Sequence, residues 1–218
     1  MKKAYGWMIG LTLLSFVTVG IFLTLAPDTV AVHYNAAGEI DRWGSKYEFL
    51  LFPFFSSIMG IFMGFLARHE GRQGREENAK VVAGTGIWVL VLFNGLWLFF
   101  LWKGLKGAGL TETATLGVKG LYLLLTASLI PMGNVMPKAR RNSLFGLRTK
   151  WSMADDVCWQ KSQRAGGYLL MLTGIAGTAL VALVPVEWAA YVILGFLFVM
   201  TIAAMVATYV IWKRQQKK

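Results

Sequence analysis

The chain has 218 residues, of which 56% are hydrophobic and only 15% charged, and its net charge is +11. A soluble domain of this size carries about a quarter charged residues, so the composition excludes an ordinary soluble globular protein and favours a membrane protein. The positive charge is compatible with nucleic-acid binding as well. The positions of the basic residues therefore have to decide between these classes.

Six apolar segments are each close to the roughly 20 residues that cross ~30 Å of hydrocarbon. They cover residues 7–26, 49–67, 81–102, 117–136, 167–184 and 188–212. We therefore expect an all-α integral membrane protein with six transmembrane helices. A structured extracellular loop should join the first two spans, and a cytoplasmic loop with a short interfacial helix should join the fourth and fifth.

The basic residues indicate the orientation of these spans. If the N-terminus is cytoplasmic, 17 of the 22 Lys and Arg residues lie in cytoplasmic segments, and only Arg42, Lys46, Lys103, Lys106 and Lys119 lie outside. The positive-inside rule then predicts that both termini face the cytoplasm, in a plasma membrane. This distribution explains the net charge through contact with anionic membrane lipids, without direct binding of nucleic acid.

The predicted spans contain almost none of the ionisable side chains that mark proton paths and ion sites in membranes. Their deepest strongly polar residue is Asn94, and Cys158 is the only cysteine in the chain. No nucleotide-binding, hydrolase or zinc-protease motif is present. We therefore expect no enzymatic activity, no cofactor and no metal site.

The connection between the first two spans is too specific in composition to be a plain linker. The stretch "TVAVHY" has the β-branched and aromatic residues typical of a strand, whereas "NAAGEIDRWGSK" is rich in turn formers, including Gly38. A loop that only covers two helix ends is the alternative to a ligand-binding surface. The candidate ligand-binding residues are His33, Tyr34, Asn35, Asp41, Arg42 and Trp43.

The second long connection follows the fourth span. In "NSLFGLRT", turn formers flank apolar residues, which predicts that the segment around Leu144 dips back toward the membrane. Ser152, followed three residues later by Asp155, resembles a capping box. This pattern predicts an interfacial helix from Met153 to about Arg164 that leads into the fifth span.

The positive-inside rule explains the basic residues of this second loop but not its other residues. Either the loop is a simple membrane anchor, or it is a folded site that binds a partner; a nucleic-acid strip would need a supporting domain that the chain lacks. The candidate partner-binding residues are Asn134, Asn142, Gly146, Arg148, Thr149, Trp151 and Trp159.

Two sets of residues resemble known families. Pro27, Val32, His33, Asn35, Gly38 and the run "DRWGSK" at 41–46 resemble the DUF1648 module, an extracytoplasmic loop between two helices of bacterial membrane proteins. The second loop resembles the signature of the SdpI family. Its matching residues are Gly133, Asn134, Pro137, Asn142, Gly146, Arg148, Thr149, Trp151, Ser152 and Trp159.

The match to the SdpI signature has two departures, since Lys150 replaces a common Pro and Gln163 replaces a common His. The second departure argues against an obligatory histidine chemistry at that position. From both resemblances we expect a DUF1648-like module at residues 1–80 and an SdpI-like module at residues 81–218.

The resemblance implies a function and two partners. Proteins of the SdpI family protect bacteria against secreted peptide toxins, so a secreted peptide toxin is the expected partner. The family also implies toxin sensing, in which a cytoplasmic ArsR-like repressor is held at the membrane. The alternative is a transporter of small molecules or lipids, because the two long loops share the order Pro, Asn, Gly, Arg, Trp on opposite sides, as inverted repeats would.

Overall fold

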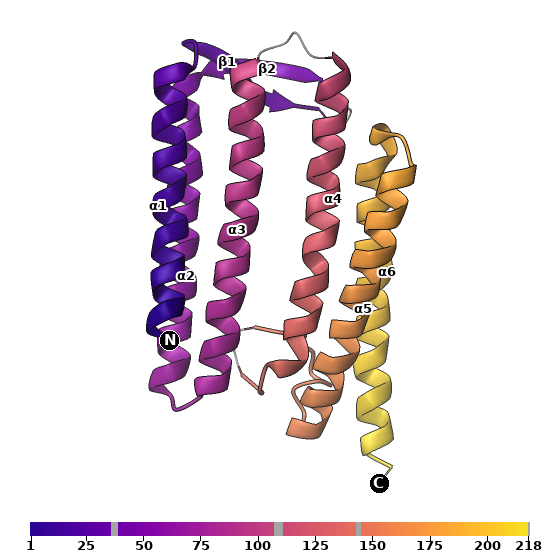
Figure 1. The fold of residues 1–218 in the computed structure, drawn as a ribbon. Coiled ribbons are helices and arrows are strands. Elements are labelled where there is room, and N and C mark those ends of the chain that lie inside the picture. Colours follow the sequence, from indigo (N-terminus) through magenta and orange to yellow (C-terminus); the bar gives the residue numbers. More distant parts are fainter. Residues whose placement is uncertain (36–38, 107–110, 143–144, 218) are drawn as a thin grey trace.

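The computed structural model describes residues 1–35, 39–106, 111–142 and 145–217. Six long helices run up and down, with a β-hairpin at one end of the bundle and both chain termini at the other (Figure 1). The elements are α1 (Lys2–Leu25), β1 (Thr29–Tyr34), β2 (Ile40–Ser45), the 3-10 helix η1 (Lys46–Leu50), α2 (Leu51–Arg72), α3 (Glu76–Lys106), α4 (Thr111–Val135), the 3-10 helix η3 (Met136–Lys138), α5 (Asp156–Leu183) and α6 (Val186–Gln215).

Six helices of the described chain are long and apolar enough to cross a membrane. This confirms the predicted class, a multi-pass α-helical membrane protein with six spans. The predicted turn at Gly38 and the predicted dip at Leu144 lie outside the described residues.

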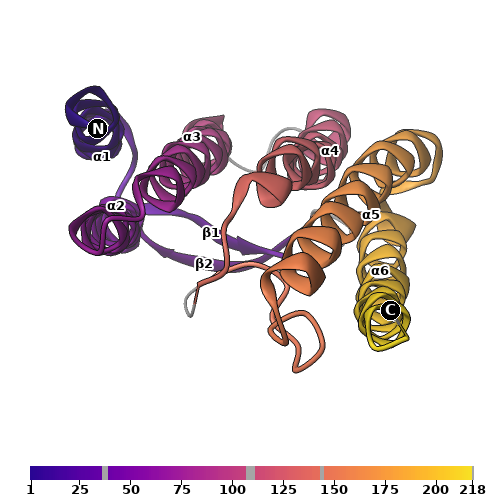
Figure 2. The same cartoon turned by 90° about the horizontal axis from the view of Figure 1, so that it is seen from below.

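The helices pack as two groups of three. One group consists of α1, α2 and α3, the other of α4, α5 and α6, and the two groups meet mainly where α3 packs against α4 (Figure 2). The predicted module boundary at residue 80 falls inside α3, which packs with α1 and α2. The division into two modules stays a prediction.

Aromatic rings fill the first group near the hairpin. Phe22 of α1 lies with its ring centroid 4.6 Å from that of Phe49, and Phe52 of α2 stacks on Trp97 of α3 at 4.1 Å. At greater depth, the Asn94 side-chain amide donates to the backbone carbonyl of Leu11 at 3.0 Å. This bond joins α3 to α1 through Asn94, the deepest strongly polar residue of the predicted spans.

Glycines let α4 and α5 approach each other closely in the second group. A Cβ atom built on Gly133 would lie 2.6 Å from the backbone oxygen of Gly167, and a Cβ on Gly167 would meet the oxygen of Gly133 at the same distance. Small residues at a helix crossing bring the backbones into van der Waals contact, which drives association where water offers no hydrophobic gain.

The connection between α1 and α2 folds as an antiparallel hairpin in which Val30 pairs with Gly44 and Ala31 with Trp43. The predicted strand "TVAVHY" is confirmed as β1. The prediction of turns throughout "NAAGEIDRWGSK" is wrong for residues 40–45, which form β2. Backbone pairing with β1 outweighs the weak local strand propensity of these residues, and the buried Val30 joins the aromatic core below.

The separate interfacial helix predicted from Met153 to about Arg164 is replaced by the first turns of α5. This helix begins after Asp155, whose carboxylate accepts from the backbone N–H of Cys158 at 2.7 Å, and continues without a break to Leu183. Ser152 is therefore not the N-cap. No proline interrupts the segment, so the helix that starts at Asp156 propagates into the span.

The cap at Asp155 makes a testable contribution to stability. Hydrogen bonds from the backbone N–H of Cys158 lower the pKa of the Asp155 carboxyl. We expect Asp155→Ala to lower the free energy of unfolding by about 1 kcal/mol. Asp155→Asn should retain most of the stability at neutral pH, because an amide oxygen also accepts this bond.

The pH dependence of unfolding distinguishes the carboxylate from the amide. The pKa of the Asp155 carboxyl is lower in the folded than in the unfolded protein. The carboxylate therefore stabilises the fold at pH values above its unfolded-state pKa, and this stabilisation is lost as the pH falls below about 4. Thermal unfolding in detergent at several pH values should show a smaller acid-side loss for Asp155→Asn than for the wild type. Equal acid-side losses would contradict the assignment.

Candidate functional site

The β-hairpin presents a polar outer surface built by a hydrogen-bonded His–Asp pair and an Arg–Glu ion pair. His33 Nδ1 lies 2.6 Å from an Asp41 carboxylate oxygen, and Arg42 donates to Glu48 at 2.9 Å. Both pairs are solvent-exposed, and Trp43 beside them has 49% of its surface exposed. Exposed ion pairs contribute little to stability, so this arrangement leaves a charged and aromatic surface that is free to bind.

The other two predicted residues of this loop have supporting positions. The ring of Tyr34 faces the bundle, where the ammonium of Lys103 lies 4.3 Å from its centroid, and burial raises the pKa of the Tyr34 phenol. Asn35 accepts from the backbone N–H of Glu39 at 2.9 Å and donates to its carboxylate at 2.8 Å. Both residues hold the hairpin, and His33, Asp41, Arg42 and Trp43 form its outer surface.

At the opposite end, residues 139–155 form a loop, here called the signature loop, that a side chain of α5 holds in place. The Gln163 amide donates to the backbone carbonyl of Leu147 and accepts from its N–H, both at 2.9 Å. Gly146 precedes this contact with a φ of +100°, and a Cβ there would lie 2.8 Å from the Gln163 oxygen. The site therefore requires glycine both for its backbone angle and for space.

Hydroxyl groups close the second half of the signature loop. Ser152 Oγ accepts from the backbone N–H of Thr149 and donates to the carbonyl of Leu147, each at 2.8 Å. The Thr149 hydroxyl donates to that of Thr208 on α6 at 3.1 Å. Ser152 therefore folds the loop back on itself, and Thr149 fastens it to the last helix.

The first half of the signature loop is fixed by Trp159 and Asn142. The indole N–H of the buried Trp159 donates to the carbonyl of Ala139 at 2.7 Å. Asn142 donates to the carbonyl of Arg140 and accepts from the N–H of Phe145, both at 2.9 Å. These predicted residues serve the internal structure of the loop.

The remaining predicted residues of this region lie on the surface. Trp151 packs its ring edgewise on Tyr209, with centroids 5.2 Å apart, and Lys150 lies over its outer part. Arg148 is exposed, and within the described chain its side chain has no hydrogen bond or ion pair. Asn134 is exposed on α4, away from the loop. Arg148 and Lys150 are thus exposed on the loop, and Trp151 is partly exposed beside Lys150.

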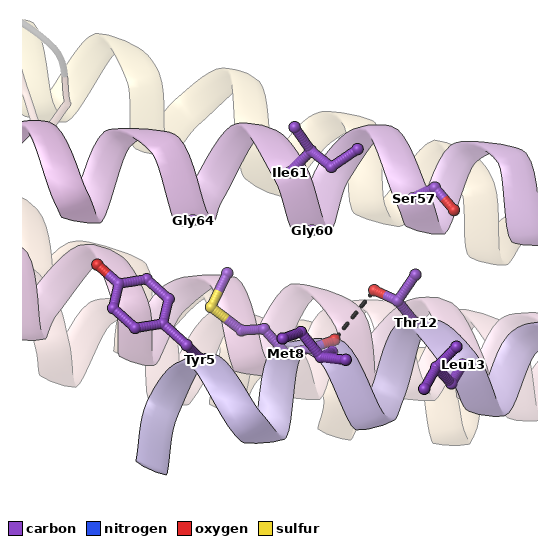
Figure 3. Close-up of a pocket in the computed structure, with 9 residues that line it drawn as sticks. Tyr5, Met8, Thr12, Leu13, Ser57, Gly60, Ile61 and Gly64 are labelled. Carbon is purple, nitrogen blue, oxygen red and sulfur yellow. Dashed lines mark hydrogen bonds between the residues drawn. The ribbon is translucent and has the colours of Figure 1, made fainter. Parts of the chain in front are cut away.

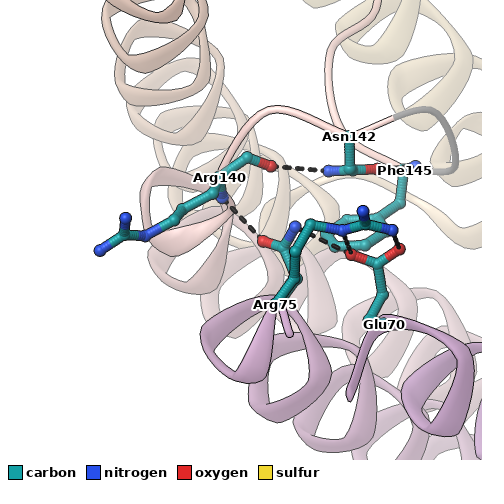
Figure 4. Close-up of polar contacts among 6 residues, drawn as sticks. Glu70, Arg75, Arg140, Asn142 and Phe145 are labelled. Carbon is teal, nitrogen blue, oxygen red and sulfur yellow. Dashed lines mark hydrogen bonds and ion pairs between the residues drawn. The ribbon is translucent and has the colours of Figure 1, made fainter. Parts of the chain in front are cut away.

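A buried carboxylate connects this loop to the first helix group. Glu70, fully buried at the end of α2, accepts two hydrogen bonds from Arg75 at 2.8 Å and one from Asn78 at 3.0 Å. The Asn78 amide oxygen accepts from the backbone N–H of Arg140 at 2.8 Å. Figure 4 shows that this chain of contacts continues through Arg140 to Asn142. The turn between α2 and α3 is therefore bound to the start of the signature loop.

Sequence reasoning missed the residues that hold the signature loop and the turn between α2 and α3 in place. They are Glu70, Arg75, Asn78, Gln163 and Thr208. Glu70 stands among basic residues at the end of the second span, and this position could have indicated an ion pair. The sequence did not show which residues pair with it, because they lie outside this span. In the described residues no three His, Cys, Asp or Glu side chains lie together in a way that could hold a metal ion. The arrangement places two exposed polar surfaces at opposite ends of one helical bundle.

The amide clamp on Leu147 can be tested through stability. Gln163→Leu leaves two backbone groups of the loop without partners, and each such loss costs about 1–3 kcal/mol. We expect a lower unfolding temperature in detergent and faster proteolysis within residues 139–155. Gln160→Leu, on the exposed face of the same helix, is the matched control. Equal proteolysis of the two variants would refute the clamp.

Comparisons with known proteins match the region of the signature loop and the region of the hairpin separately. Residues 138–211, which include the whole signature loop, match the SdpI/YfhL protein family, and residues 10–56, which include the hairpin, match the domain of unknown function DUF1648. The chain is 29% identical over 93 residues to the "Immunity protein SdpI" of Bacillus subtilis (strain 168).

That alignment covers 43% of this chain and 40% of the relative, so the chain aligns with less than half of the length of the curated relative. No solved structure matches the chain. The DUF1648 and SdpI regions follow each other on one chain, whose described residues include six helices long and apolar enough to span a membrane, and together these similarities support an SdpI-family protein.

Proposed function

We propose that this protein is a bacterial immunity protein that protects the cell carrying it from a secreted, membrane-active peptide. The name of the Bacillus relative supports this role. The observation that carries the proposal is the hairpin, an exposed surface that is fixed on the helix ends by the buried Val30 and Ala31. The distribution of basic residues supports an orientation with this hairpin outside and both termini in the cytoplasm.

The hairpin can bind a peptide in a physically simple way. Trp43 supplies an exposed aromatic surface, the ion pair of Arg42 with Glu48 supplies charges of both signs, and the His33–Asp41 pair adds hydrogen-bonding groups. Exposed tryptophans flanked by polar groups are frequent centres of binding energy in protein interfaces. A peptide bound here is held at the membrane surface, where it can no longer form a pore.

The transporter alternative has less support. The two long connections share the order Pro, Asn, Gly, Arg, Trp, but the first folds as a β-hairpin and the second as an irregular loop closed by side chains. A pair of inverted repeats would give corresponding structures at the two ends.

The immunity role is tested by expression in a sensitive bacterial strain. The strain is challenged with peptides purified from the culture medium of the bacterium that carries this chain. We expect the inhibitory concentration of at least one peptide to rise. Trp43→Ser should lose most of the protection, since loss of a central tryptophan costs about 2 kcal/mol, or roughly thirtyfold in affinity.

The matched control is Trp188→Ser. Trp188 is 61% exposed near the start of α6, at the hairpin end of the bundle but in the other helix group. This variant should protect like the wild type, and membrane levels of all variants are compared by immunoblot. Failure of the wild type to protect against any secreted peptide would contradict the role. Equal effects of the two substitutions would contradict the assignment to the hairpin.

We further propose that the signature loop recruits a cytoplasmic protein, with a small ArsR-like repressor as the candidate. The supporting observation is the exposed guanidinium of Arg148 beside Lys150 and Trp151, on a loop that is otherwise closed internally. The repressor encoded nearest the gene is co-expressed with the protein, and its share in the membrane fraction is measured.

In this fractionation, Arg148→Gln should reduce the membrane-bound share of the repressor. Arg214→Gln, which removes the same charge from the end of α6, should leave it unchanged. A repressor that stays soluble beside the wild-type protein, even in the presence of protective peptide, would contradict the proposal.

A further inference from the structure

A groove between α1 and α2 lies outside both of the surfaces described above. It has a volume of about 290 Å³ and runs between Tyr5, Met8 and Thr12 of α1 and Gly60 and Gly64 of α2 (Figure 3). A second hollow of about 470 Å³ shares Tyr5 and Gly64 with it and extends to Arg68. The two hollows therefore lie next to each other, and the second lies nearer the end of the bundle that carries the chain termini.

The walls of the groove are apolar even where hydroxyl groups line it. Thr12 donates to the backbone carbonyl of Met8 at 3.0 Å, and Ser57 donates to that of Pro53 at 2.8 Å. Neither hydroxyl therefore needs a partner from the groove. At Gly64, the nearest atom to an added Cβ is the Met8 methyl at 3.8 Å. The absence of a side chain at this glycine leaves space for the chain of a ligand.

The surroundings show where the occupant comes from. Ile9, Leu13 and Ile61 border the groove and are 60%, 57% and 73% exposed. Large apolar side chains with this exposure on membrane-spanning helices face hydrocarbon. The occupant is therefore a component of the bilayer.

The end of the groove near the termini is positively charged. Arg68 is exposed there, and its side chain forms no hydrogen bond or ion pair within the described residues. Lys2 and Lys3 begin α1 one turn before Tyr5. The neighbouring carboxylate, Glu70, is buried and already bonded to Arg75. Arg68 therefore has no counter-charge among the described residues, and a lipid phosphate would supply one.

The length of the groove fits one leaflet. Ser57 and Arg68 are 11 positions apart in the sequence, which corresponds to about 16 Å along a helix at about 1.5 Å per residue. Half of the hydrocarbon core is ~15 Å thick. One acyl chain of a phospholipid can therefore lie beside Gly64 while its headgroup reaches Arg68.

A second copy of the chain fits this groove less well. A two-fold axis along the membrane normal would bring identical surfaces together. It would then place Arg68, Lys2 and Lys3 of both copies close to each other without a counter-charge. An anionic lipid neutralises the same cluster.

We propose that the groove between α1 and α2 is a binding site for one anionic phospholipid from the leaflet on the side of the chain termini, with Arg68 at the phosphate and Gly64 beside the acyl chain. The site does not depend on the proposed immunity role. Occupancy of this site in the first helix group depends on the lipid composition of the membrane.

Native mass spectrometry of the full-length protein in detergent tests this site. The protein is mixed with equal amounts of phosphatidylglycerol and phosphatidylcholine, and the bound lipids are counted. We expect the first bound lipid to be phosphatidylglycerol, with a preference of roughly fivefold from one well-placed basic residue. Arg68→Gln should abolish the preference, and Arg68→Lys should retain most of it. Gly64→Leu, which fills the groove, should reduce binding of both lipids.

Arg214→Gln is the matched control, because it removes an equal charge from the same end of the bundle but from α6. It should keep the wild-type preference. Three results would overturn the proposal: equal binding of the two lipids by the wild type, an equal loss in Arg214→Gln and Arg68→Gln, or a lipid-free dimer that Gly64→Leu dissociates.

Discussion

The signature loop depends on one physical constraint, which is that its backbone polar groups must find partners beside a bundle of apolar helices. A buried N–H or carbonyl without a partner costs about 1–3 kcal/mol, and an irregular loop has no regular ladder to supply one. Here Gln163 binds both backbone groups of Leu147, Ser152 closes the next turn, and Trp159 binds the carbonyl of Ala139. The shape of this end of the protein follows from these bonds.

The buried Glu70 extends the same constraint across the molecule. Removal of its partner would leave an uncompensated buried charge, a change that typically costs about 3–5 kcal/mol. Through Asn78, this carboxylate connects α2 and α3 to the signature loop, while the other ends of α1 and α2 carry the hairpin. The two exposed surfaces therefore belong to one frame, which suits a protein that meets a peptide on one side and a partner on the other.

Sequence reasoning succeeded where a single local property decides the outcome. Apolar length predicted six spans, and β-branched residues predicted the strand at 29–34. It failed for β2, because Asp41, Arg42 and Gly44 are weak strand formers that pair only when β1 lies opposite. It also predicted a separate interfacial helix capped by Ser152, because two potential caps lie three residues apart, whereas in the structure Asp155 caps one continuous helix that includes the fifth span.

The sequence by itself determined the membrane class, the number of spans, the unequal distribution of basic residues and the residues of both family signatures, since these depend on composition and order along the chain. Only the tertiary structure decided what each signature residue does. Tyr34, Asn142 and Trp159 are turned into internal contacts, whereas Trp43 and Arg148 remain exposed. Tyr34 contacts Lys103 and Trp159 binds Ala139, and these contacts exist only after distant parts of the chain have packed, whereas Asn142 closes a local turn with Phe145.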